Sequence, residues 1–126
     1  MTTKGISLSS SLTPARGDVW RVDFNPVKGD EIMKIRPAVV ISSDAFSPLD
    51  TKIVVPLTGW QDKFTNSQWM VKIIADTSNG LDHDSAADAL QLRCVSYERF
   101  TLKLGTVSAP ILDEIAAAIA IVIEFQ

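Results

Sequence analysis

The sequence predicts a mainly β domain: a small, strongly bent antiparallel sheet or barrel followed by one C-terminal helix. Short runs of β-branched and aromatic residues recur between segments rich in Pro, Gly, Asn and Asp, a pattern typical of strands joined by turns. Only the last segment repeats apolar residues at spacings of three and four, as an amphipathic helix does. The length of 126 residues fits a single hydrophobic core.

The first strand is expected at residues 18–24 (DVWRVDF), where apolar and charged side chains alternate. This alternation places Trp20, Val22 and Phe24 on one face. Residues 25–35 combine Pro, Gly and many charged side chains, so they predict a long loop.

The middle of the chain predicts three further strands. The β-branched runs 37–43 and 52–57 are expected to be buried strands, and turn-forming residues at 44–51 separate them. Residues 58–68 predict an exposed loop, after which apolar residues alternate again over 69–75.

Residues 86–95 fit a helix or a strand by pattern alone. Leu90, Leu92 and Cys94 alternate with polar residues, which favours a strand in the second half and places Cys94 in the core. Residues 96–108 then predict one short helical turn and a strand that closes the sheet.

The C-terminal helix has clear boundary signals. Ser108 is the expected N-cap and Pro110 fits the first turn. The stripe expected to face the core consists of Leu112, Ile115, Ile119 and Val122. A second apolar stripe, which implies burial on another side as well, consists of Ile111, Ala118, Ile121 and Phe125.

The composition argues against several kinds of site. One histidine, His83, and one cysteine, Cys94, are too few for a disulfide framework, a multi-histidine metal site or a Cys-cluster zinc site. His83 is expected in an exposed polar turn. Asp82, Asp84 and Asp88 lack the spacing of an EF-hand and are expected to be solvated. We therefore expect neither a metal nor a cofactor.

The net charge of −3 arises from 12 basic and 15 acidic residues. The acidic excess lies wholly in residues 109–126, so residues 1–108 are balanced. Binding of nucleic acid depends on local potential, and a balanced domain is compatible with it.

Residues 1–15 are rich in Ser and Thr, without the apolar core of a secretory signal, and are expected to be a flexible tail. Residues 16–126 are expected to form the domain. The apolar run at 115–123 is too short to span a bilayer. We expect a reducing bacterial cytoplasm as the compartment.

Once these kinds of site are set aside, the remaining candidates for a catalytic site are Glu31, Arg36 and Thr58. Arg36 precedes Pro37, which biases it toward extended backbone at a strand entrance. Thr58 stands at the exit of the strand predicted over 52–57. A guanidinium and a hydroxyl together suit a phosphodiester, because the guanidinium pairs with two oxygens and the hydroxyl donates to another.

Six motifs in order carry a family resemblance. They are GDVW at 17–20, GDE at 29–31, RPAVV at 36–40, VVPLT at 54–58, QLR at 91–93 and LG at 104–105. Together they resemble the MazF/PemK family of toxin endoribonucleases over residues 16–126. The resemblance implies a compact SH3-like, CcdB-like barrel and a homodimer. It also implies sequence-specific, metal-independent cleavage of single-stranded RNA at short sequences, which leaves a 2′,3′-cyclic phosphate and a 5′-hydroxyl. Inhibition by a cognate antitoxin with an acidic, disordered C-terminal segment is implied as well.

Residue by residue, the family's arginine falls on Arg36, its Thr/Ser on Thr58 and its loop glutamate on Glu31. Glu31 is a candidate proton acceptor, and a loop salt bridge to Lys28 or Lys34 is the open alternative.

Further RNA contacts are expected from cationic and aromatic side chains. Lys28, Lys34, Lys52 and Lys63 are candidates for phosphate contacts, while Trp60 and Phe64 could stack on unpaired bases. For Trp60, packing in the core or a dimer is the open alternative. Gln91 and Arg93 match the family's Gln-hydrophobic-Arg strand.

Two other functions use the same fold. A CcdB-like gyrase poison acts by binding alone, and a decayed toxin would only titrate antitoxins. A gyrase poison does not need an arginine and a threonine together at these strand ends, whereas a decayed toxin stays an open alternative.

Overall fold

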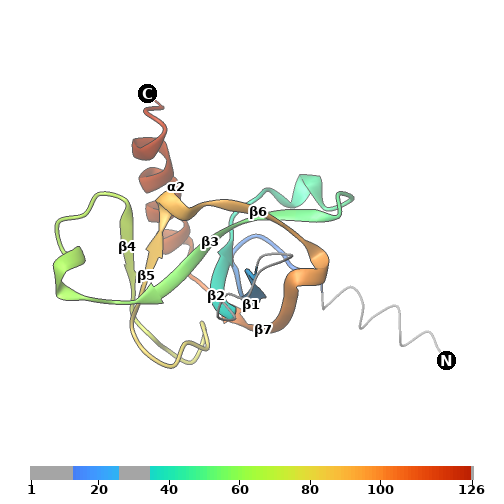
Figure 1. Ribbon diagram of the computed structural model, residues 1–126, viewed down its shortest axis with the longest axis horizontal. Coiled ribbons are helices and arrows are strands. Elements are labelled where there is room, and N and C mark those ends of the chain that lie inside the picture. Colours follow the sequence, from blue (N-terminus) through green and yellow to red (C-terminus); the bar gives the residue numbers. More distant parts are fainter. Residues whose placement is uncertain (1–12, 26–34, 126) are drawn as a thin grey trace.

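A computed structural model describes residues 13–25 and 35–125 as a curved antiparallel sheet with a C-terminal helix (Figure 1). The strands are β1 (Asp18–Asp23), β2 (Ile35–Val40), β3 (Thr51–Gly59), β4 (Met70–Ile73), β5 (Ser85–Asp88), β6 (Arg93–Ser96) and β7 (Phe100–Thr106). The helix is α2 (Ala109–Val122). Single 3-10 turns lie between strands: η1 (Asp44–Phe46), η2 (Asp62–Phe64), η3 (Ala89–Gln91) and η4 (Tyr97–Arg99). The predicted mainly β fold with one C-terminal helix is confirmed.

The sheet has seven strands in the order β4-β5-β3-β2-β1-β7, and β6 pairs with β3 outside this path. Among the described residues no ladder joins β4 to β7, so the expected barrel is a bent sheet that stays open. The predicted tail falls mostly outside the described residues. Of its last three residues, Ala15 donates its backbone N–H to the Asp18 carboxylate at 2.9 Å.

β3 is the long strand on which the site depends, because different parts of it pair with different neighbours. Along one side, Val54 pairs with Arg93 of β6 and Leu57 pairs with Ala87 of β5. Val55 and Pro56 therefore face the whole segment 88–92, which leaves the ladder and includes η3. Pro56 has no N–H to donate, so a continuous ladder at this level would lack a donor.

The two faces of the sheet carry separate apolar clusters. One face packs against α2, and its buried residues include Val19, Val39, Val55, Leu57, Ile73 and Ile115. The other face curls over a smaller cluster made of Trp20, Val22, Phe24, Ala38, Val40, Val54 and Val95. The alternation predicted for the first strand is confirmed, since its three aromatic and aliphatic residues share the second cluster.

The segment 86–95 differs from the prediction. Its second half is not one strand, because the Asp88 carboxylate accepts a hydrogen bond from Leu90 N at 3.1 Å and favours the turn η3 over a ladder. Leu90, Leu92 and Cys94 are consequently exposed. The placement of Cys94 in the core was wrong.

Helix α2 begins as expected, with the Ser108 hydroxyl accepting from Ile111 N at 3.4 Å. The first stripe packs on the core. The second stripe divides: Ile111 and Ala118 also pack there, whereas Ile121 and Phe125 are exposed. No helix of the described chain is long and apolar enough to cross a membrane.

Lys52 lies at the opposite end of β3 from Thr58 and is only 2% exposed. Its ammonium has no hydrogen-bond partner among the described residues and lies 5.9 Å from the ring centroid of Tyr97. A buried polar group without a hydrogen bond lowers stability.

Lys52→Met is therefore expected to raise the free energy of unfolding by about 1–3 kcal/mol, the usual cost of such a buried group. Urea unfolding followed by tryptophan fluorescence measures it. Lys63→Met, which alters an exposed lysine, is the control and should change stability by no more than about 0.5 kcal/mol. A Lys52→Met protein less stable than wild type would show that the ammonium has a stabilising partner.

Candidate active site

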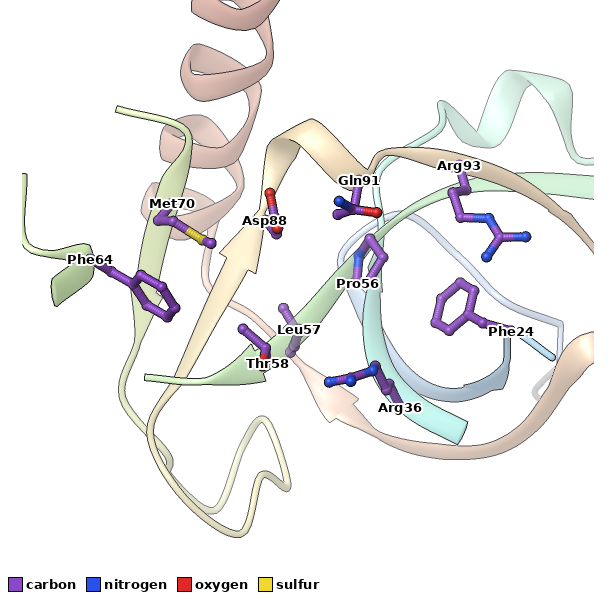
Figure 2. Close-up of a pocket in the computed structure, with 10 residues that line it drawn as sticks. All are labelled: Phe24, Arg36, Pro56, Leu57, Thr58, Phe64, Met70, Asp88, Gln91 and Arg93. Atoms are coloured by element: carbon purple, nitrogen blue, oxygen red, sulfur yellow. The ribbon is translucent and has the colours of Figure 1, made fainter. Parts of the chain in front are cut away.

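A cleft of about 420 Å³ opens beside the interruption between β5 and β6 (Figure 2). It continues the second face of the sheet beyond the small apolar cluster. Its lining residues are Phe24, Arg36, Pro56, Leu57, Thr58, Phe64, Met70, Asp88, Gln91 and Arg93.

Arg36 and Thr58 meet in this cleft because of the β2–β3 register. Ala38 pairs with Pro56, and in an antiparallel pair the same register continued by two residues brings Arg36 opposite Thr58. Both side chains are half-buried. Figure 2 shows the guanidinium of Arg36 extending toward the end of β3 that carries Thr58. The two residues predicted as a pair therefore lie together.

Gln91 lies in η3, outside the ladder, and Arg93 lies where β6 resumes pairing with β3; both side chains line the cleft. The Arg93 guanidinium lies 5.1 Å from the ring centroid of Phe24, a cation–π contact. Phe24 is 7% exposed and belongs to the small apolar cluster. The buried Phe24 ring thus holds the Arg93 guanidinium, the second cation of the cleft, at the end of the cleft opposite η2.

The segment after β3 supplies aromatic side chains. Trp60 and Phe64 form an edge-to-face pair with ring centroids 5.7 Å apart. Lys72 Nζ lies 5.0 Å from the Trp60 ring and Lys63 Nζ lies 5.8 Å from the Phe64 ring. Phe64 lines the cleft, whereas Trp60 packs beside it and remains half-exposed.

Not all predicted site residues are brought together. Lys52 is buried at the far end of β3 and is not among the residues that line the cleft. Glu31, Lys28 and Lys34 lie outside the described residues.

Met70 and Asp88 line the cleft, although neither was predicted as a site residue. Met70 pairs with Asp88 across β4 and β5, and both line the cleft. Their position depends on a strand register that no local pattern reveals.

A neighbouring cleft of about 230 Å³ shares Arg36 and Thr58 and is also lined by Arg21, Gly59 and His83. His83 is exposed, as predicted. A β-carbon added to Gly59 would lie 3.6 Å from His83 Nε2, so the imidazole lies close to the end of β3.

The described part of the chain contains no group of three or more His, Cys, Asp or Glu side chains able to hold a metal ion. The cleft instead combines two guanidinium groups, a hydroxyl, an amide, aromatic rings and the carboxylate of Asp88. Guanidinium groups pair with phosphate oxygens, and aromatic rings stack on unpaired bases. This donor set suits a single-stranded polynucleotide.

Comparison with known proteins agrees with this chemistry. The family model for PemK-like, MazF-like toxins of type II toxin–antitoxin systems matches residues 15–123. Endoribonuclease MazF9 of Mycobacterium tuberculosis is 34% identical over 110 residues, which cover 82% of this chain and 91% of that protein. Endoribonuclease EndoA of Bacillus subtilis is 31% identical over 110 residues, covering 84% and 90%.

Solved structures share the fold. MazF of Deinococcus radiodurans superposes with a TM-score of 0.72 at 21% identity, covering 90% of this chain and 98% of that one. An endoribonuclease in complex with its cognate antitoxin, from a mycobacterial species, superposes with a TM-score of 0.71 at 18% identity, covering 90% and 97%.

Proposed function

The chain belongs to the PemK-like, MazF-like family of type II toxins, and from that premise we propose that it is an endoribonuclease that cleaves single-stranded RNA without a metal ion. The observation that carries the proposal is the meeting of Arg36 and Thr58 in one cleft, with Arg93 held nearby on Phe24. Non-catalytic inhibition does not require this pair, and the endoribonuclease relatives favour cleavage.

The reaction is an internal transesterification. The ribose 2′-oxygen attacks the adjacent phosphorus in line, and the bond from phosphorus to the 5′-oxygen of the next nucleotide breaks. The 2′-hydroxyl loses its proton to a base, and the departing 5′-oxygen gains a proton. The products are a 2′,3′-cyclic phosphate and a 5′-hydroxyl. The enzyme has to orient the reacting atoms and stabilise the charge that develops on the phosphoryl oxygens.

Arg36 supplies the charge stabilisation. A guanidinium stays protonated in proteins and presents parallel N–H donors, so it can pair with two oxygens of the pentacoordinate phosphorane. Thr58, expected opposite Arg36 from the strand register, donates its hydroxyl hydrogen to a phosphoryl oxygen. Because strand pairing holds both backbones, little reorganisation is needed as the charge develops.

Glu31 is the proposed proton acceptor for the 2′-hydroxyl. It lies outside the described residues, so this role rests on the family resemblance alone. A loop salt bridge to Lys28 or Lys34 stays the alternative.

The RNA strand is proposed to run across the cleft. Arg93 and Lys63 pair with phosphates next to the scissile one, and Gln91 hydrogen-bonds a base. Phe64 provides a stacking surface within the cleft, and Trp60 extends it. Lys28 and Lys34 are proposed as further phosphate contacts, and Lys52 is left out because it is buried.

A cognate antitoxin with an acidic, disordered segment is the proposed inhibitor, because such a segment competes with RNA phosphates for the same cations. The bacterial cytoplasm, where messenger RNA is available, is the proposed location.

A homodimer is proposed from the exposed apolar residues. Ile53 and Cys94 are cross-strand partners on β3 and β6, and Leu90 and Leu92 continue the exposed surface along the chain. The turn η3 packs against α2. Ile121 in the last turn of α2 and Phe125, which follows the helix, are exposed. Apolar surface of this extent marks an interaction site.

Cleavage of single-stranded RNA is expected to continue in excess EDTA, because the nucleophile is the substrate's own hydroxyl. An oligonucleotide with one 2′-deoxyribose on the 5′ side of the cut should resist cleavage at that position only. Gel analysis of labelled oligonucleotides checks both. Cutting at the deoxy position would overturn the proposed mechanism.

Arg36→Ala is expected to lower the single-turnover rate at least ~10²-fold, the effect of removing one preorganised charge stabiliser. Arg36→Lys should restore only part of the rate, because an ammonium cannot form the paired hydrogen bonds. Thr58→Ala should also lower the rate substantially. Arg16→Ala and Thr106→Ala are the controls, since Arg16 lines a separate cleft beside α2 and Thr106 is exposed on β7. Full activity of Arg36→Ala would show that the site is misassigned.

Light scattering at micromolar concentration is expected to give twice the mass of one chain. Leu92→Asp should shift the protein toward monomer, because it places a charge within the exposed apolar surface. Leu102→Asp, at an exposed leucine on β7, should leave the dimer intact. A wild-type monomer, or equal effects of the two substitutions, would contradict this interface.

A further inference from the structure

Asp88 is the one carboxylate among the described residues that line the cleft. A negative charge there opposes binding of a phosphate and does not fit a surface designed for the RNA backbone alone. Building on the proposed function, we propose that Asp88 selects the base next to the scissile phosphate, and that this base is guanine.

The strand register places Asp88 close to Thr58. Thr58 pairs with Ala86 and Leu57 pairs with Ala87, so Asp88, two residues beyond Ala86, shares the face that carries Thr58. The cross-strand partner of Asp88 on β4 is Met70. Figure 2 shows Asp88 on the β5 side of the cleft and Arg36 on the other side of β3.

The carboxylate is not neutralised by the nearby arginines. The ion pair found among the described residues joins Lys103 to Asp18, and none links Asp88 to Arg36 or Arg93. The half-buried carboxylate is therefore an acceptor that neither arginine of the cleft engages in an ion pair.

One oxygen of Asp88 is already oriented by the fold. Oδ1 accepts the hydrogen bond from Leu90 N at 3.1 Å that starts η3. No hydrogen bond from the described residues engages Oδ2. Each carboxylate oxygen accepts up to two hydrogen bonds, so the group is held in one direction with acceptor capacity left for a ligand.

An acceptor-only group selects a ligand by its donors. RNA phosphates carry none, so the carboxylate must face a sugar hydroxyl or the edge of a base. Unpaired bases present their Watson–Crick edges to proteins. Guanine alone offers two adjacent donors on that edge, N1–H and the N2 amino group, which match the two oxygens of a carboxylate. Adenine and cytosine offer one amino group, and the N3–H of uracil lies between two carbonyl oxygens that a carboxylate repels.

The neighbouring side chains fit a base at this position. Met70 is the cross-strand partner of Asp88, and Phe64 lines the same side of the cleft. A thioether and an aromatic ring give an apolar surface against which a base can pack, and the carboxylate then reads its edge.

The test begins with a long single-stranded RNA that wild-type protein cleaves, in which the cut sites are mapped. Oligoribonucleotides with one such site are then made with G, inosine, A, C or U at each position flanking the cut, and kcat/KM is measured for each. We expect a preference for G over U of about 10–100-fold at one flanking position, the range for one bidentate base contact. Inosine, which keeps N1–H but lacks the amino group, should fall between them.

Asp88→Asn separates base recognition from the structural role of the side chain. Its amide oxygen can still accept from Leu90 N, so η3 should persist, but the two-acceptor pattern is lost. We expect this variant to lose the preference for G, so that the ratio of kcat/KM for the G-containing to the U-containing oligonucleotide falls toward 1. Asp84→Asn is the matched control, because Asp84 also accepts a backbone hydrogen bond, from Ala75 N at 2.9 Å, outside the cleft.

Each other outcome overturns the proposal. An equal loss on all oligonucleotides would make Asp88 a general structural residue, and a uniform gain would mean that it faces phosphates. If Asp88→Asn fails to fold by circular dichroism, the wild-type comparison of G with inosine and U still decides. Wild-type cleavage without preference for G contradicts this inference alone, whereas no cleavage of any RNA contradicts the proposed function as well.

Discussion

Along one side of β3, strand pairing is interrupted opposite Val55 and Pro56, between β6 and β5. The cleft opens at this interruption. Proline cannot donate to a neighbouring strand, and the chain opposite it leaves the ladder between Ala87 and Arg93. The Asp88 carboxylate holds the departing chain in a 3-10 turn. Without this interruption, β5 and β6 would form one straight edge, and Gln91 and Arg93 would have no shared cleft with Thr58.

The two faces of the sheet have different roles: one packs against α2 to form the larger apolar cluster, and the other carries the cleft. One face is sealed by α2 and gives the molecule most of its buried apolar residues. The other face covers the smaller cluster, and the cleft lies next to that cluster. Phe24 is buried in the cluster, and its ring contacts the Arg93 guanidinium at the cleft. A site built on paired strands fits the proposed chemistry, which depends on groups that are already oriented toward the developing charge.

Sequence patterns predicted the features that depend on neighbouring residues. The alternation around Trp20, the capping of α2 by Ser108 and the positions of Arg36 and Thr58 at strand ends all follow from local rules. Features that depend on strand register were missed. Cys94 alternates like a core residue, but it lies on an edge that nothing in the described chain covers.

Lys52 and Asp88 also show that local sequence patterns do not give the distance of a residue from the site. Lys52 lies farther from the site than expected, and Asp88 lies closer. Lys52 was expected at the RNA as one of several cationic side chains, but the length of β3 separates it from Thr58 by about 20 Å. Asp88 lies far from Thr58 in sequence and reaches its vicinity only through the pairing of β3 with β5.

The central claim is that the cleft catalyses attack by the RNA's own 2′-hydroxyl. Mass spectrometry of the two fragments from one defined oligoribonucleotide, cleaved in EDTA, tests it most directly. The account predicts a 5′ fragment that ends in a 2′,3′-cyclic phosphate, one water lighter than the linear phosphate, and a 3′ fragment that begins with a 5′-hydroxyl. A 5′-phosphate paired with a 3′-hydroxyl would mean that water is the nucleophile, and would contradict it.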